Sequence, residues 1–281
     1  MKKLTLLLIV ATVILFASCN QKKTQADVGI VSPEENLITF KFTPYIIEPI
    51  RGDMSNFNRI DMWLIEGDNV YDYHQVKADA GASFGTMYVA LNRTKTYTLY
   101  SVAHCTNEAA TLTDGVISFA NDAVTSSAYF TTTFTPETTT TVNCVMQRII
   151  GQFRLCVTDD LPDNFDHITL EFSETGTRLN VNGTATNKIE RSQTFTEFYT
   201  TPSPKYVGSY LMADDLENTT YITVTATAYD ENDDVIETKT FTEVPLKDGY
   251  RTIYTGAFFT TTGVNFQFSV EDWNSFNDHP Y

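Results

Sequence analysis

Apolar and polar residues alternate with a period of two in several segments after Asn36. The alternating segments are residues 38–43, 60–64, 141–147, 153–158, 222–228 and 264–270. Successive side chains of a strand point to opposite faces, so each segment predicts a strand with one apolar and one polar face. No segment of ten or more residues after Asn36 has helical periodicity. The pattern predicts an all-β fold of antiparallel sheets packed as sandwiches.

Turn-forming residues separate these segments. Clusters rich in Gly, Pro, Asn and Asp lie at residues 66–69, 159–164 and 230–234. The last cluster lies between two Thr-rich segments and predicts a hairpin. The Thr-rich tract 131–141 contains Phe134 and Pro136. It predicts a pair of strands around a proline turn.

A domain boundary is predicted near residues 148–151, where one alternating segment ends and the next begins. The 281 residues suffice for one large domain or for two of about 100–150 residues each. We expect residues 36–148 and 149–281 to form two β-sandwich domains. Residues 19–35 are polar enough at their start to serve as a flexible tether.

The N-terminus has the pattern of a secretory signal, spanning residues 1–18. Met1-Lys2-Lys3 is cationic, and the run from Leu4 to Phe16 is apolar apart from two threonines. That run is too short to span a bilayer, which needs about 20 residues. The small residues Ala17 and Ser18 before Cys19 resemble a bacterial lipobox. An ordinary signal peptide with a chance cysteine is the alternative.

In lipobox proteins the leader is removed before the cysteine, whose thiol is diacylated. Two or three acyl chains hold a protein firmly, whereas a single chain holds it only marginally. The resemblance therefore implies a lipoprotein attached to outer-membrane lipid through acylated Cys19.

The charge balance is strongly acidic, with 35 Asp and Glu against 19 Lys and Arg and a net charge of −16. Nucleic-acid binding depends on a cationic surface that displaces counterions, so a nucleic-acid partner is not expected. An acidic body is also repelled by an anionic membrane surface.

The sequence contains no motif for catalysis, metal binding or cofactor binding. None of the four histidines has a metal-ligand spacing, and nucleophile-elbow, phosphate-loop and dinucleotide motifs are missing. His104 and Cys105 are adjacent on an expected strand and would point to opposite faces, so they cannot act as a base and nucleophile pair. Residues 230–234 lack the glycine and terminal glutamate of an EF-hand. We expect neither an enzyme nor a bound metal or cofactor.

Three cysteines remain after Cys19, an odd number for an oxidising compartment. Cys144 is expected on the apolar face of its strand and Cys156 on the polar face. Two of Cys105, Cys144 and Cys156 could form one disulfide, and the spacing does not select the pair.

Three segments resemble the fimbrillin family of Bacteroidetes-type (type V) pili. They are residues 148–157, residues 244–260, which contain Pro-Leu, Tyr-Arg-Thr and Phe-Phe-Thr, and the closing residues 264–273. The resemblance implies two tandem Greek-key sandwiches of the transthyretin-like type. It also implies a structural lipoprotein of a surface fimbria, an anchor or accessory subunit at the outer membrane that assembles with other fimbrial subunits in adhesion.

The family resemblance also implies candidate assembly residues. In polymerising members a protease cuts after Arg or Lys and removes the first strand, and a neighbour's strand fills the groove. Here that strand would be residues 37–43, with Ile38, Phe40 and Phe42 on its buried face. Arg51 is the candidate cleavage site, and Arg59 is the second choice. Anchor-type members stay uncut.

A surface glycan-binding lipoprotein without catalytic activity is the alternative function. Trp63 falls on the face opposite Met62 and Leu64, where it could stack on a sugar. A solvent-facing platform of aromatic side chains would favour this alternative.

Overall fold

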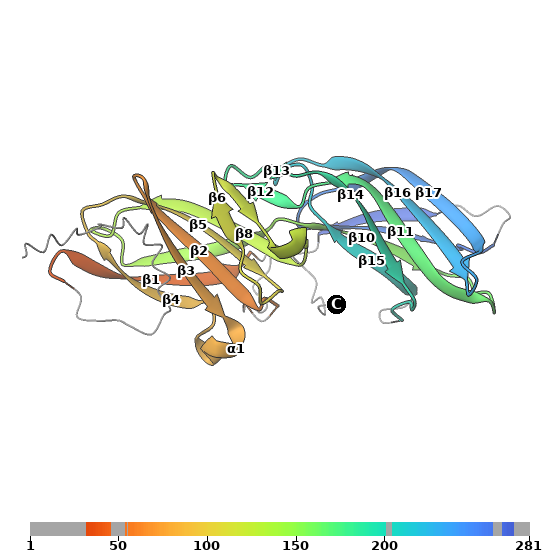
Figure 1. Ribbon diagram of the computed structural model, residues 1–281, viewed down its shortest axis with the longest axis horizontal. Helices are drawn as coiled ribbons and strands as arrows, with labels where there is room; N and C mark the ends of the chain where they lie inside the picture. Colours follow the sequence, from red (N-terminus) through yellow and green to blue (C-terminus); the bar gives the residue numbers. More distant parts are fainter. Residues whose placement is uncertain (1–31, 46–53, 55, 201–203, 261–265, 273–281) are drawn as a thin grey trace, which may run out of the picture.

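The structure, a computed structural model, describes residues 32–45, 54, 56–200, 204–260 and 266–272. Strands dominate it (Figure 1). Within the described residues the helical elements are the short α1 (Lys77–Ala80) and two 3-10 turns, η1 (Gly81–Ser83) and η2 (Ala120–Asp122). The prediction of an all-β fold is confirmed.

Seven strands of the N-terminal half form one continuous sheet around a single core. Across the sheet they are β3 (Asn69–Val76), β2 (Arg59–Glu66), β5 (Tyr97–His104), β8 (Ser127–Phe134), β9 (Thr141–Arg148), β1 (Glu35–Pro44) and β4 (Thr86–Asn92). β8 and β9 share two residue pairs, Ala128 with Arg148 and Tyr129 with Gln147. The sheet divides there into layers of four and three strands, whose apolar faces supply the same core.

Eight strands of the C-terminal half form two four-stranded sheets. One sheet has the order β15 (Lys205–Leu211), β10 (Gly151–Val157), β18 (Tyr250–Gly256) and β19 (Gln267–Asp272). The other has the order β14 (Ile189–Phe195), β11 (Phe165–Thr175), β16 (Thr220–Asp230) and β17 (Val235–Leu246). Their inner faces meet in a second core, where the ring of Phe153 on β10 lies 5.8 Å from that of Phe172 on β11.

The first strand of each half has the same kind of neighbours. β1 is antiparallel to β4 and parallel to β9, and β10 is antiparallel to β15 and parallel to β18. The other strand pairs of the main sheets are antiparallel, as the alternation predicts. Each first strand thus lies inside its sheet, not at an edge.

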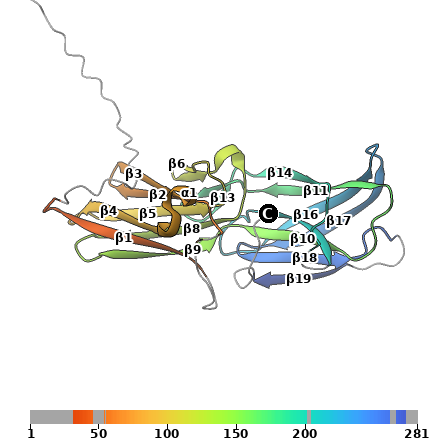
Figure 2. The same ribbon diagram turned by 90° about the horizontal axis from the view of Figure 1, so that it is seen from below.

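A small fourth sheet joins the two halves, which lie end to end along the long axis (Figures 1 and 2). Its order is β13 (Ala185–Thr186), β12 (Arg178–Asn180), β7 (Val116–Ser118) and β6 (Thr111–Thr113). Beneath it lies a third apolar cluster, which takes Trp63 and Ile117 from one half and Ile149 and Leu179 from the other. Apolar side chains of the two halves are therefore buried against each other.

We propose residues 36–148 and 149–281 as two domains. The first core draws on residues 38–146, and the second on residues 153–258. Each is large enough to stabilise one sandwich. Deleting either half should therefore expose the residues of the third cluster but leave the core of the other half intact.

The predicted hairpin at residues 230–234 and the predicted pair of strands around Pro136 are confirmed. β16 and β17 pair across residues 230–234, and the backbone N–H of Asp234 donates to the Asp230 carboxylate at 3.0 Å. β8 and β9 flank Pro136, as the Thr-rich tract predicts. Short turn segments carry enough local information to be predicted without knowledge of the whole fold.

The prediction of a polar outer face is wrong for β2 and β10. Trp63 on β2 is only 2% exposed, and Cys156 on β10 is buried as well. The third cluster covers the second face of β2, so residues 59–64 of that strand are buried on both faces. Because Trp63 is buried, it cannot stack on a sugar as the glycan-binding alternative requires.

The prediction of a buried apolar face is wrong for Phe268 and Val270 of the last strand. Phe266 packs against the core as predicted, and Val264 lies outside the described residues. Phe268 and Val270 on β19 are 61% and 45% exposed. β19 is the edge strand beyond β18 and pairs on one side only. Phe268 stacks on Tyr254 at 5.6 Å but is not part of the core. An edge position leaves an inward-facing side chain without a partner on the opposite sheet.

Candidate functional site

The predicted exchangeable strand lies at the centre of the first sandwich. Ile38, Phe40 and Phe42 are buried on one face of β1. The ring of Phe40 meets that of Phe134 on β8 edge-on at 5.7 Å, across the core. The alternation in the sequence places these three side chains correctly, because a period of two puts them on one face.

Backbone pairing holds β1 on both sides. Its residues Glu35–Lys41 pair with β4, and its residues Thr39–Pro44 pair with β9. Removing β1 would leave an apolar groove flanked by two unpaired strand edges. Unpaired edges beside an apolar groove are the features to which an added strand binds.

The other predicted site residues lie outside the described part of the chain or are inaccessible. Cys19 and Arg51 lie outside the described residues. Arg59, the second choice for cleavage, is buried in β2, and its guanidinium pairs with Asp61 at 2.8 Å. A protease could not reach the Arg59 bond in the folded chain.

Asp61 on β2 is the centre of a buried polar network that the sequence analysis missed. Its carboxylate accepts hydrogen bonds from Arg59 Nε at 2.8 Å and from the backbone N–H of Ala110 at 3.1 Å. It also lies 2.9 Å from Nε2 of His104 on β5. Burial raises the pKa of Asp61, but the hydrogen bonds from His104 and Arg59 outweigh that effect and hold the pKa below its ordinary value.

The network also contains a hydroxyl, yet its surroundings favour a structural role. Thr106 Oγ1 lies 2.9 Å from Nδ1 of His104, so a hydroxyl, an imidazole and a carboxylate follow one another. A nucleophile needs space for a substrate beside it. Neither cavity described below is lined by these residues, and the His104 ring packs edge-on against Phe119 at 5.7 Å. The network ties β2, β5 and the segment around Ala110 together.

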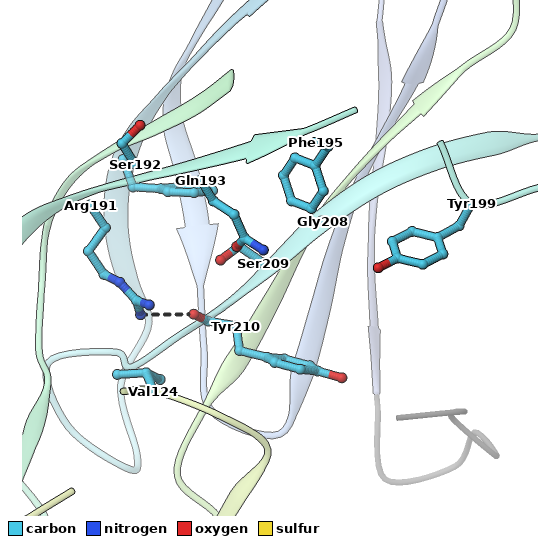
Figure 3. Close-up of a pocket in the computed structure, with 10 residues that line it drawn as sticks. Val124, Arg191, Ser192, Gln193, Phe195, Tyr199, Gly208, Ser209 and Tyr210 are labelled. Atoms are coloured by element: carbon cyan, nitrogen blue, oxygen red, sulfur yellow. Dashed lines mark hydrogen bonds between the residues drawn. The ribbon is translucent and has the colours of Figure 1, made fainter. Parts of the chain in front are cut away.

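A cavity of about 250 Å³, here called the β14–β15 cleft, opens between the edge strands of the second sandwich (Figure 3). It is lined by Val124, Phe172, Arg191, Ser192, Gln193, Phe195, Tyr199, Gly208, Ser209 and Tyr210. Figure 3 shows the polar ends of Gln193 and Ser209 close together near its centre. The Arg191 guanidinium enters from the β14 side, with Nη1 donating to the Tyr210 carbonyl at 3.2 Å.

A second cavity, of about 320 Å³, lies where the two halves meet. Tyr129 and Gln147 line it from one half and Val181 and Leu216 from the other. The Tyr129 hydroxyl donates to the Val181 carbonyl at 2.8 Å. No charged side chain lines this cavity, so it offers less for ligand recognition than the β14–β15 cleft.

The described residues contain neither a disulfide nor a group of His, Cys, Asp and Glu side chains suited to a metal. Cys105, Cys144 and Cys156 are free thiols. Burial raises the pKa of Cys144 to about 12, so its thiol is not a nucleophile at neutral pH. No three metal-binding side chains come together in the described residues. None of the helices in this part of the chain is long and apolar enough to span a membrane.

The family comparison matches two thirds of the chain. A family described only as a family of unknown function (DUF6562) matches residues 92–279. The match includes the whole second sandwich and the later strands of the first. No curated protein matches the sequence.

Several solved structures of bacterial proteins are similar to this chain in fold. A candidate polysaccharide-binding protein (DUF1812) from Bacteroides thetaiotaomicron matches with a TM-score of 0.52 and 13% identity, over 85% of this chain and 97% of that one. A candidate adhesin from the same species matches with a TM-score of 0.53 and 8% identity, over 88% and 98%. The fimbrial anchor protein Mfa2 from Porphyromonas gingivalis matches with a TM-score of 0.47 and 12% identity, over 85% and 98%. The candidate adhesin shows that the expected resemblance holds at the level of the fold.

Proposed function

The chain belongs to the family of unknown function DUF6562, and we propose that it is a non-catalytic structural protein of a surface fimbria that acts in cell adhesion. Its fold is that of a protein described as a candidate adhesin, which supports the adhesive role. Its partners are other fimbrial subunits, and its place is the outer membrane, as an anchor or an accessory subunit.

The single observation that carries this proposal is the position of β1. It is the first strand of the described chain, it lies between two other strands, and it buries Ile38, Phe40 and Phe42. Burying each such side chain contributes about 1.5–3 kcal/mol. A sandwich that lost β1 would be driven to bind another strand with the same alternation. This geometry supports the proposal that subunits exchange strands.

Exchange of β1 is tested by cutting the chain and offering a replacement strand. We expect the chain cut after Arg51, and stripped of its N-terminal fragment, to bind a peptide of residues 35–44 and to stay monomeric while the peptide is present. Without the peptide it should form oligomers, because the groove and both edges are open. Light scattering after size-exclusion chromatography measures the mass.

The peptide itself supplies the matched control. A peptide with Phe40→Asp and Phe42→Asp carries charge on the buried face and should not prevent oligomers. A peptide with Lys41→Asp and Thr43→Asp changes the exposed face and should work like the natural sequence. A stripped chain that stays folded and monomeric without any peptide would show that β1 is dispensable and would contradict strand exchange.

We further propose that acylated Cys19 anchors the protein. The lipobox pattern at Ala17-Ser18-Cys19 supports this assignment. In its native cells, Cys19→Ala should abolish palmitate labelling and move the protein from the membrane fraction to the soluble fraction. Cys105→Ala is the matched control and should stay labelled and membrane-bound. Membrane retention of the Cys19→Ala chain at wild-type level would refute the anchor.

A further inference from the structure

Polar side chains occupy the inner face of the second sandwich at the β14–β15 cleft, where apolar residues are expected. On β14, Arg191 pairs in register with Phe172 and Gln193 with Leu170, and both partners belong to the core. On β15, Ser209 pairs with Phe153, another core residue. Cross-strand partners share a face, so Arg191, Gln193 and Ser209 lie on the inner faces of the two sheets. Ser209 is buried, Arg191 is half-buried, and Gln193 is exposed at the open edge of the cleft.

The Arg191 guanidinium is half-buried and has no carboxylate partner among the described residues. Burial alone lowers its pKa, and it stays protonated because arginine does not lose its charge in proteins. Its one hydrogen bond within the described residues goes to the neutral Tyr210 carbonyl. In a chain with 35 acidic and 19 basic residues, a partly desolvated cation left without an acid is a candidate for binding an external anion.

Neutral groups around Arg191 add a second kind of recognition. The Gln193 amide and the Ser209 hydroxyl are not engaged in hydrogen bonds within the described residues. The Tyr199 hydroxyl points towards them from the far side of the cleft (Figure 3). The rings of Phe195 and Phe172 also line the cleft. Amide and hydroxyl groups beside apolar rings are suited to the hydroxyls and apolar face of a sugar.

We propose that the β14–β15 cleft binds a carboxylated sugar unit, with Arg191 holding the carboxylate and Gln193 and Ser209 contacting the hydroxyls. The volume of about 250 Å³ lies just below the range of about 300–1,000 Å³ typical of sites for drug-sized ligands, so it suits one sugar ring. The proposal concerns a different sandwich from β1 and does not depend on strand exchange.

An inward-pointing charge on an edge strand also prevents unwanted strand pairing. That role accounts for Arg191 on β14 but requires neither a cavity nor the polar groups of Gln193 on the same strand and Ser209 on β15. The two roles differ in their consequences, because only a ligand site discriminates between a sugar acid and the matching neutral sugar.

The test is calorimetric titration of the full chain with glucuronate and with glucose, which lacks the carboxylate. We expect saturable binding of glucuronate and at least tenfold weaker binding of glucose. Arg191→Gln should weaken glucuronate binding at least tenfold, to the level of glucose. Arg191→Lys should recover only part of that loss, because a lysine lacks the forked donors of a guanidinium. Arg93→Gln, the same change at an exposed arginine, should leave binding unchanged.

A second variant keeps the test valid if Arg191→Gln disturbs folding. Ser209→Ala removes only a hydroxyl and should weaken glucuronate binding about threefold to tenfold, the usual worth of one hydrogen bond. Equal binding of glucose and glucuronate, unchanged binding by Arg191→Gln, or no saturable binding would overturn the proposal. Inorganic phosphate that competes as strongly as glucuronate would also overturn it, in favour of a site for a free anion.

Discussion

Replacing Asp61 with alanine is expected to lower the free energy of unfolding by about 3–5 kcal/mol, the cost of breaking a buried ion pair by removing one partner. Arg59 and His104 would lose the carboxylate to which both are hydrogen-bonded, and the buried guanidinium would be left without its partner. The backbone N–H of Ala110 would lose its acceptor too. Urea unfolding at pH 7 measures the change.

The control for Asp61→Ala lies in the turn that follows the same strand. Asp68 is exposed there, so Asp68→Asn should leave the unfolding midpoint unchanged. The pKa of Asp61 is lowered in the folded chain, so its contribution is present above the ordinary carboxyl pKa and is lost as the pH falls through the folded value. The gap between wild type and Asp61→Ala should shrink in acid. A gap below about 1 kcal/mol at pH 7, the worth of an exposed ion pair, would show that the network does not stabilise the fold.

Strands were predictable from the sequence wherever one face is apolar and the other meets solvent. Ile38, Phe40 and Phe42 alternate with polar residues, and β1 buries them as expected. The same rule fails for Trp63, because residues from the other half cover the second face of β2. Such cover depends on contacts between distant segments, which local alternation does not contain.

The β14–β15 cleft was not predictable because polar residues stand on an inner face, where the pattern expects apolar ones. Residues 189–195 of β14 have no apolar alternation, since Arg191 and Gln193 occupy positions where the pattern expects apolar side chains. Sequence patterns identify a strand by its apolar face, so they do not identify a strand whose inward positions are polar.

The Asp61 network was not predicted for a similar reason. The sequence shows only two charged residues, Arg59 and Asp61, on one face of a strand. Their partner His104 is distant in the sequence, so the pattern does not reveal the network.

Asp248 should make the protein less stable as the pH rises from about 4 to about 8. It lies buried in the turn between β17 and β18, where Oδ1 accepts a hydrogen bond from the Ala213 backbone N–H at 3.2 Å. Oδ2 has no partner among the described residues. Burial, reinforced by the charge of Asp215, raises the pKa of Asp248 to about 8. In this pH range the folded chain keeps the proton that the unfolded chain releases, and the difference favours unfolding.

Asp248→Asn removes this penalty, because the amide is neutral in both states. The variant should match the wild type in stability near pH 4 and exceed it near pH 8, by on the order of 2–4 kcal/mol. Thermal unfolding at a series of pH values measures the difference. Asp163→Asn, at an exposed position in the loop before β11, is the control and should follow the wild-type pH dependence. If Asp248→Asn were destabilising by the same amount at every pH, the Asp248 carboxyl would be acting through shape or hydrogen bonding and not through a proton retained in the folded state.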